Sequence, residues 1–220
     1  MINLFEVEEG TKPKQSFDVV GRFRAGHQVK KRPMSLSDWR VTSDDPDVTA
    51  KVAELYGGTS QTWDNERQPH EVFTSVSSVK IVLEKSFSGM TLWGRNAPIR
   101  KCDGATLSYP EDQVGEACEC AKFNSIADRK AAADKGTGCQ PDITLRFRLA
   151  EAYNLGTFEF KTGSWGMARE INDIEATLAK FGGTAVGTLT LEPVEFTNSE
   201  GQLRKYTKTV VDLTGAYTAA

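Results

Sequence analysis

The clearest alternation of hydrophobic and polar positions lies in residues 143–149, which read ITLRFRL. Every second residue there is apolar, which is typical of a strand with one face in a core and the other in solvent. Residues 157–162, TFEFKT, alternate in the same way. We therefore predict a hairpin of two strands with a somewhat long turn. The positions expected to face the core in the first strand are Ile143, Leu145, Phe147 and Leu149.

Helical spacing replaces this alternation in three other segments. From about Met167, apolar residues recur at positions 171, 174 and 178 and two glycines follow at 182–183, which predicts an amphipathic helix. A shorter helix is expected to start at Pro46, with Asp45 as its N-cap, and to end at the glycines 57–58. Its buried face would carry Val48, Val52 and Leu55. A third short helix is expected at residues 126–135.

Segments rich in β-branched residues predict the remaining strands. They are residues 72–83, 90–93, 189–196 and 206–213, with the last two joined across 198–201. Residues 19–29 are expected to form a hairpin of their own, with its turn near residues 24–27. This order fits an α+β fold in one domain, residues 1–220, with an antiparallel sheet or a partly open β-barrel, which includes the oligonucleotide-binding type.

Composition places the chain among ordinary globular proteins. Of its 220 residues, 39% are hydrophobic and 26% are charged, which allows a substantial core without disulfides. The sequence has no apolar run long enough to span a membrane, and its first residues lack the basic and apolar regions of a secretory signal. We therefore expect a cytoplasmic protein.

Charge is unevenly distributed along the chain. The net charge of −3 and the pI near 5.6 provide no general attraction to nucleic acid. Residues 12–40 are mostly basic, however, and residues 44–71 are mostly acidic. We expect these stretches to form solvated faces that partly neutralise each other after folding.

All the cysteines lie in one segment and suggest a metal site. Cys102, Cys118, Cys120 and Cys139 have the spacing C-x15-C-x-C-x18-C. The segment around them, residues 101–142, has few large apolar side chains and cannot build a core of its own. Four thiolates around a tetrahedral Zn²⁺ would hold this zinc loop closed from within. Because four protein ligands leave no position for water, such a zinc ion would be structural.

Two other interpretations of the cysteines stay open. Disulfides are one, although thiols in a cytoplasmic protein should remain reduced. Four unrelated buried thiols are the other. The C-x-C pair also departs from the usual C-x2-C knuckle of zinc sites.

Groups suited to catalysis are few. His27 and His70 are the histidines of the chain, and neither lies in a recognisable nucleophile or metal motif. The sequence contains neither a Walker loop nor G-x-G-x-x-G. Residues 163–166, GSWG, lack the full G-x-S-x-G pattern and are expected to form a turn into the helix near Met167. We therefore predict that the protein is not an enzyme.

Short stretches spread over most of the chain resemble a known family. They are VVGRF at 19–23, RP at 32–33, LSDWRVT at 36–42, LWGRNAPI at 92–99, CDG at 102–104, CEC at 118–120, DRKAAA at 128–133, PDI at 141–143, RFRLAE at 146–151, FEF at 158–160, GSW at 163–165 and YTK at 206–208. In this order they resemble the recombination directionality factors that partner large serine integrases in actinobacterial phages.

The resemblance implies a protein that binds a serine integrase and switches it from integration to excision of the viral genome, the attL × attR reaction. It implies contact with attachment-site DNA mainly through the integrase, no small-molecule substrate, no membrane, and a location in the cytoplasm of the bacterial host. The surfaces that we consider for the integrase are the basic hairpin at Arg22 to Arg32 and the zinc loop.

Aromatic residues support an alternative function. Side chains able to stack on bases would suit a single-stranded DNA-binding accessory protein of phage replication or recombination. The residues in question are Trp93, Trp165, Phe158 and Phe160. Their alternation with polar positions favours core packing, which would remove them from any such surface.

Overall fold

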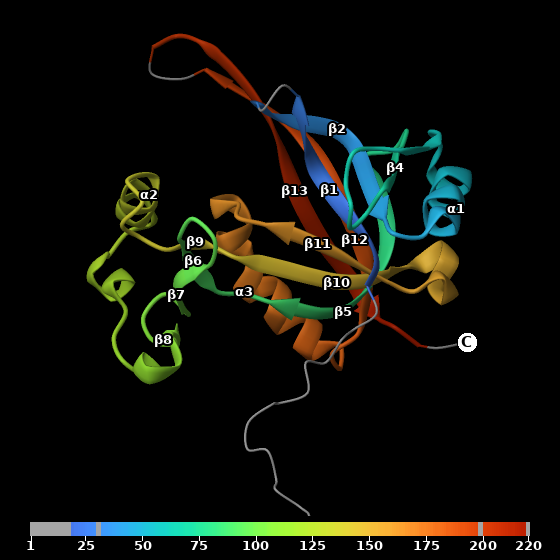
Figure 1. Cartoon of the computed structure of the whole chain (residues 1–220). Coiled ribbons are helices and arrows are strands. Elements are labelled where there is room, and N and C mark those ends of the chain that lie inside the picture. The colour runs from blue at the N-terminus through green and yellow to red at the C-terminus, as the bar shows by residue number, and fades with distance from the viewer. Residues whose placement is uncertain (1–18, 30–31, 198–199, 219–220) are drawn as a thin grey trace, which may run out of the picture.

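A nine-stranded open sheet runs through the molecule in the computed structural model, which describes residues 19–29, 32–197 and 200–218 (Figure 1). Among the described strands, β1 and β11 pair in parallel and every other neighbouring pair is antiparallel. In spatial order the strands are β13 (Leu203–Ala216), β12 (Ala185–Thr197), β5 (Ser78–Phe87), β10 (Ile143–Leu149), β11 (Thr157–Thr162), β1 (Val19–Val29), β2 (Arg32–Ser43), β4 (His70–Phe73) and β3 (Ser60–Thr62).

A second, four-stranded sheet lies to one side of the large one (Figure 1). Its order is β8 (Leu107–Tyr109), β7 (Pro98–Cys102), β6 (Met90–Trp93) and β9 (Gln140–Pro141). The helices are α1 (Pro46–Tyr56), α2 (Ile126–Asp134) and α3 (Trp165–Lys180), with short 3-10 turns η1 (Glu111–Gln113), η2 (Glu119–Lys122) and η3 (Ala150–Leu155). The small sheet, α2, η1 and η2 therefore all fall between β5 and β10 in the sequence.

The core lies on one face of the large sheet, where α1 and α3 cover it. Helix α3 contributes Met167, Ile171, Ile174 and Leu178, and helix α1 contributes Val48 and Val52. At the centre, the ring of Phe23 packs edge to face against Trp39, Phe147 and Phe158, with centroids 5.5, 5.3 and 5.5 Å apart. Edge-to-face aromatic pairs add stabilisation beyond the area that they bury.

The helix ends follow from local chemistry. The carboxylate of Asp45 accepts a hydrogen bond from the backbone N–H of Asp47 at 2.8 Å and caps α1, whose first residue is Pro46. Gly57 ends that helix at φ 77°, a conformation that favours glycine. Ser164 caps α3 by accepting a hydrogen bond from the N–H of Met167 at 3.3 Å. Gly163 and Ser164 thus form the turn into the helix, whereas Trp165 and Gly166, which we expected in the turn, are its first two residues.

Most of the elements predicted from periodicity are confirmed. The α+β class is correct, and β10 and β11 form the expected antiparallel pair, with the apolar residues of β10 buried and its polar residues partly exposed. The three helices and the pair β12–β13 also lie where we expected them, although residues 198–199 of that connection lie outside the described residues. The sheet curls, so that the hydroxyl of Thr207 in β13 donates to the carbonyl of Leu36 in β2 at 2.9 Å, but it does not close into a barrel.

Two strand predictions were wrong. Residues 19–29 are one strand rather than a hairpin, because β1 pairs with β2 on both sides of a bulge in which Ala25 lies opposite four residues of β2, 36–39. Residues 72–83 are two strands rather than one. Between β4 and β5, the N–H groups of Thr74 and Ser75 donate to the carbonyls of Trp39 and Tyr56, so the chain leaves the ladder there.

The basic and acidic stretches of the sequence meet at one buried ion pair. The guanidinium of Arg40 contacts the carboxylate of Glu71 at 2.5 Å from Nη2 and 2.7 Å from Nε, and both side chains are almost fully buried. The expected partial neutralisation therefore occurs between β2 and β4.

In the described part of the chain, no helix is both long enough and apolar enough to span a membrane.

The aromatic centre generates a stability prediction. Replacing Phe147 by Ala should lower the free energy of unfolding by about 3 to 5 kcal/mol, because the change leaves a cavity between Phe23 and Phe158. Leu203→Ala, at an exposed position, is the control and should change it by less than about 0.5 kcal/mol. Urea denaturation followed by circular dichroism measures both. Equal costs for the two variants would contradict this description of the core.

Candidate metal centre

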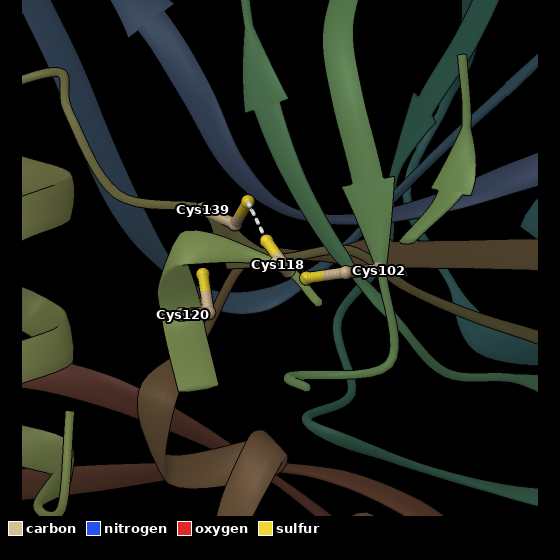
Figure 2. A group of neighbouring side chains, drawn as sticks. All are labelled: Cys102, Cys118, Cys120 and Cys139. Carbon is tan, nitrogen blue, oxygen red and sulfur yellow. Dashed lines mark hydrogen bonds between the residues drawn. The ribbon is translucent and has the colours of Figure 1, made fainter. Parts of the chain in front are cut away.

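The four cysteines converge at the small sheet (Figure 2). Cys102 ends β7, Cys118 precedes η2, Cys120 lies within it, and Cys139 immediately precedes β9. Residues from separate parts of the segment thus reach one place, as the sequence predicted. All four are buried, with 1 to 2% of each residue exposed.

Local hydrogen bonds bring these parts of the chain together. The carboxylate of Asp103 accepts from the N–H groups of Ala105 and Thr106 at 2.8 and 2.7 Å, which turns the chain sharply after β7. The carbonyl of Ala105 then accepts from the N–H of Cys118 at 2.6 Å. Two turns that follow different strands are thereby held against each other.

Helix α2 positions the fourth cysteine. Its Arg129 donates to the carbonyl of Gly104 at 2.9 Å and so ties the helix to the turn after Cys102. At the other end of the helix, a Cβ on Gly138 would lie only 2.8 Å from the Cβ of Ala132. The absence of a side chain at residue 138 therefore lets the chain pass close to α2 on its way to Cys139.

The sulfur spacing suits a shared ion better than a disulfide. The four Sγ atoms lie within 4.8 Å of one another, and those of Cys118 and Cys139 are 4.0 Å apart. Four sulfurs bound at ~2.3 Å to one tetrahedral ion would be separated by about 3.8 Å. A disulfide would need an S–S distance of about 2.05 Å, and the four thiols are free. The set can therefore hold a metal ion after small side-chain adjustments.

Thiols form most of the small core under this sheet. Its buried members are the four cysteines and Leu107, with Met90 and Leu92 packed at the side. A core of this size buries little apolar area and stabilises a sheet only weakly. Thiolate ligands joined through one ion would supply the missing stabilisation, because binding of the metal is coupled to folding of its site.

The electrostatic surroundings favour a thiolate at Cys139. A hydrogen bond from Cys102, followed by the guanidinium of Arg100, lowers the pKa of Cys139 to about 5, although burial acts in the opposite direction. Burial raises the pKa of Cys120 to about 11. Arg100 also donates to the carbonyl of Thr137 at 2.7 Å, which holds it beside the cysteines. Its positive charge would offset part of the negative charge of four thiolates around a divalent ion.

Other residues that the sequence analysis considered lie away from this centre. Within the described residues, neither His27 nor His70 belongs to a metal-ligating group, and the ring of His27 packs instead on Phe73. Phe158 and Phe160 are buried in the main core, which removes them as stacking platforms. Trp93, by contrast, is half exposed.

Sequence reasoning missed two features of the structure. Arg100 was not singled out, although its place two residues before Cys102 in a strand puts both side chains on the same face. It also missed Glu159, a buried carboxylate in β11 that three cations surround: Lys161 on the same strand, and Arg22 and Arg146 on the two neighbouring strands. No local pattern reveals Glu159 as buried, because its position is polar in the alternation of β11.

The fold and the site define an α+β protein with an open mixed sheet and a compact cluster of four buried cysteines that could hold a metal ion. Comparison with known families takes the assignment further, because the model of the Gp3-like family, described as recombination directionality factor-like, matches residues 20–214. The chain therefore belongs to the recombination directionality factor-like family. No solved structure matches the chain.

The sulfur distances lead to a prediction about the thiols. Denaturing the protein in iodoacetamide and a chelator, without reductant, should attach an alkyl group to every one of the four cysteines. Intact mass spectrometry counts the adducts, and a sample reduced before alkylation is the control. A species that carries two adducts fewer than the reduced control would reveal a disulfide and contradict the geometry.

Proposed function

We propose that this protein is a recombination directionality factor that binds a phage serine integrase and switches it from integration to excision. The observation that carries the proposal is the family membership, whose match spans residues 20–214. Resemblance of the sequence to factors that partner large serine integrases supports the serine class of the partner. The attachment-site DNA would be reached mainly through the integrase.

Such a factor works by differential binding. A ligand that binds two arrangements of a complex equally well does not change the ratio of their populations. A preference of ~3 kcal/mol for the excision-competent arrangement changes the ratio of the two by more than a hundredfold. The protein needs no catalytic group for this role, and its charged side chains make structural contacts, such as the buried pair of Arg40 with Glu71 and the partly buried pair of Arg148 with Glu84.

The chain is organised for such a role as one domain, residues 1–220, with the zinc loop, residues 101–142, inserted between strands. In support, the four-cysteine segment lies between β5 and β10, which are neighbours in the large sheet. A hydrogen bond links the two sheets: the hydroxyl of Thr91 in β6 donates to the carboxylate of Asp142, just before β10, at 2.8 Å. The loop and the hairpin of β1 and β2 are the surfaces proposed for the integrase.

Zinc is the ion that we propose for Cys102, Cys118, Cys120 and Cys139. Zn²⁺ commonly takes four cysteine thiolates in a closed tetrahedron, and it undergoes no redox chemistry. The burial of the four sulfurs and the thiol-rich small core support a structural role. The bound ion would stabilise the small sheet, and its four cysteine ligands would fix the conformation of the loop.

Metal analysis checks the zinc assignment. The purified protein should contain one zinc ion per chain, and Cys139→Ser should lose it, as measured by plasma mass spectrometry. Amide hydrogen exchange in β6 and β7 should then accelerate, while β10, in the main core, stays protected. Val114→Ala, at an exposed position in the same loop, should keep the zinc. Full zinc occupancy in Cys139→Ser would contradict the assignment of this cysteine as a zinc ligand.

A recombination assay checks the function. With a cognate serine integrase, the protein should activate the attL × attR reaction and suppress attP × attB. A tyrosine recombinase with its own sites is the control and should not respond. If neither serine reaction changes while the protein binds oligonucleotides in a salt-sensitive way, the alternative of a single-stranded DNA-binding accessory protein is favoured.

A further inference from the structure

One hollow on the outer face of the large sheet, opposite α1 and α3, collects cationic side chains. It has a volume of about 680 Å³ and lies over β1 and β11, which Figure 1 shows side by side. The charged residues in its wall are Arg22, Arg24, Arg40, Lys161 and Glu159, and we call it the cationic hollow.

Glu159 holds two of these cations in place. Its carboxylate lies 3.3 Å from Nε of Arg22 and 3.3 Å from Nζ of Lys161. On the neighbouring strand β10, Arg146 contacts the same carboxylate at 3.5 Å. The side chain of Glu159 is only 3% exposed, whereas those of Arg22 and Lys161 are 45% and 56% exposed. One buried anion therefore orients two cationic groups that remain open to solvent.

Arg24 adds a cation that neutral groups hold in place. It donates to the hydroxyl of Thr42 and to the side-chain carbonyl of Gln68, both at 3.0 Å. Arg40 also lines the hollow, but the buried carboxylate of Glu71 matches its charge. Three cations against the single carboxylate of Glu159 thus leave an excess of two positive charges in the hollow. This excess lies on a chain whose net charge is −3.

The positive patch is short, because carboxylates border it on both sides. On one side, Arg22 and Arg24 also line a smaller hollow of about 230 Å³, and Asp44 lies in its wall. On the other side, Lys161 also lines a hollow of about 640 Å³ whose wall contains Asp103 and Asp142. A long polyanion laid across this face would meet these carboxylates as well as the cations. The arrangement therefore suits a short anionic segment.

Apolar surface lies beside the cations in the same hollow. Met34 is 54% exposed there, and Trp63 is partly buried, with the guanidinium of Arg40 4.1 Å from the centroid of its ring. A protein segment can place carboxylates on Arg22 and Lys161 and an apolar side chain on this surface at the same time. The complementary ligand is thus an acidic stretch of polypeptide.

We propose that the cationic hollow binds a short acidic segment of the integrase, with an apolar side chain among its carboxylates. Cations that are already oriented form strong hydrogen bonds with carboxylates, and the guanidinium of an arginine can form two in parallel. Charge complementarity also speeds association and disfavours partners of the wrong charge. The inference rests on the proposed function, because it takes the integrase as the partner, and it adds the surface and the chemistry of the contact.

Biolayer interferometry with the full chain and a cognate serine integrase, without DNA, tests the proposal. The double variant Arg22→Gln, Lys161→Gln should bind about a hundredfold more weakly, because each lost charge-assisted hydrogen bond costs about tenfold in affinity. Binding of the wild type should also weaken as the salt concentration rises. The matched control is Lys51→Gln, Lys180→Gln, which removes equal charge from α1 and α3 and should bind within about twofold of the wild type.

A second variant covers the case in which the double variant unfolds, which circular dichroism and thermal melting would detect. Arg24→Gln leaves the three cations around Glu159 in place and should weaken integrase binding about tenfold. Equal affinity of the wild type and both variants for the integrase would overturn the proposal. The proposed function would then still stand on the excision assay, whereas a wild type that binds no integrase would contradict both.

Carbodiimide coupling identifies the occupant, because this reagent joins an amine to a carboxylate only when the two are in contact. In the complex, Lys161 should become linked to an aspartate or glutamate of the integrase, and mass spectrometry of the digested complex locates the link. Lys180, on α3, is the control and should form no link to that segment. A link from Lys161 to Glu6, Glu8 or Glu9 of this chain instead would overturn the choice of occupant. Oligonucleotide binding that the double variant weakens would overturn it in favour of nucleic acid.

Discussion

The parallel pairing of β1 with β11 is the constraint on which most of this structure depends. It joins a strand from the start of the described chain to one far along the sequence, and it brings Phe23 onto Phe158 in the aromatic centre. Close approach is possible because Gly21 has no side chain; a Cβ there would lie 2.9 Å from the ring of Phe158. Any side chain at residue 21 would therefore push against the centre of the core.

The same pairing determines the chemistry of the opposite face. Side chains alternate along each strand, so a register that buries Phe23 and Phe160 on one side necessarily brings Arg22 beside Glu159 on the other. Burying a carboxylate is costly unless charged partners surround it, and Glu159 has three. Packing of the core and arrangement of the cations are thus two results of one register.

The small sheet is stabilised in a different way. Where the large sheet relies on aromatic and aliphatic packing, the small one has four thiols and a single buried leucine. With the proposed zinc ion bound there, its stability would follow metal occupancy rather than buried area. This separation would allow the loop to vary in shape among related proteins without disturbing the main core, since its main link to that core is the short stretch around Asp142.

The sequence by itself determined the features that depend on local periodicity and local chemistry. The alternation of β10, the cap at Asp45 and the spacing of Ile171, Ile174 and Leu178 each need only nearby residues, and the confinement of every cysteine to one segment predicted their convergence. Only the tertiary structure decided that β1 continues past a bulge formed by residues 36–39 of β2, that β1 lies beside β11, and that Glu159 is buried among cations. The physical reason is that the alternation of apolar and polar residues determines which side chains share a face of a strand. Which strand lies beside it depends on packing between distant parts of the chain.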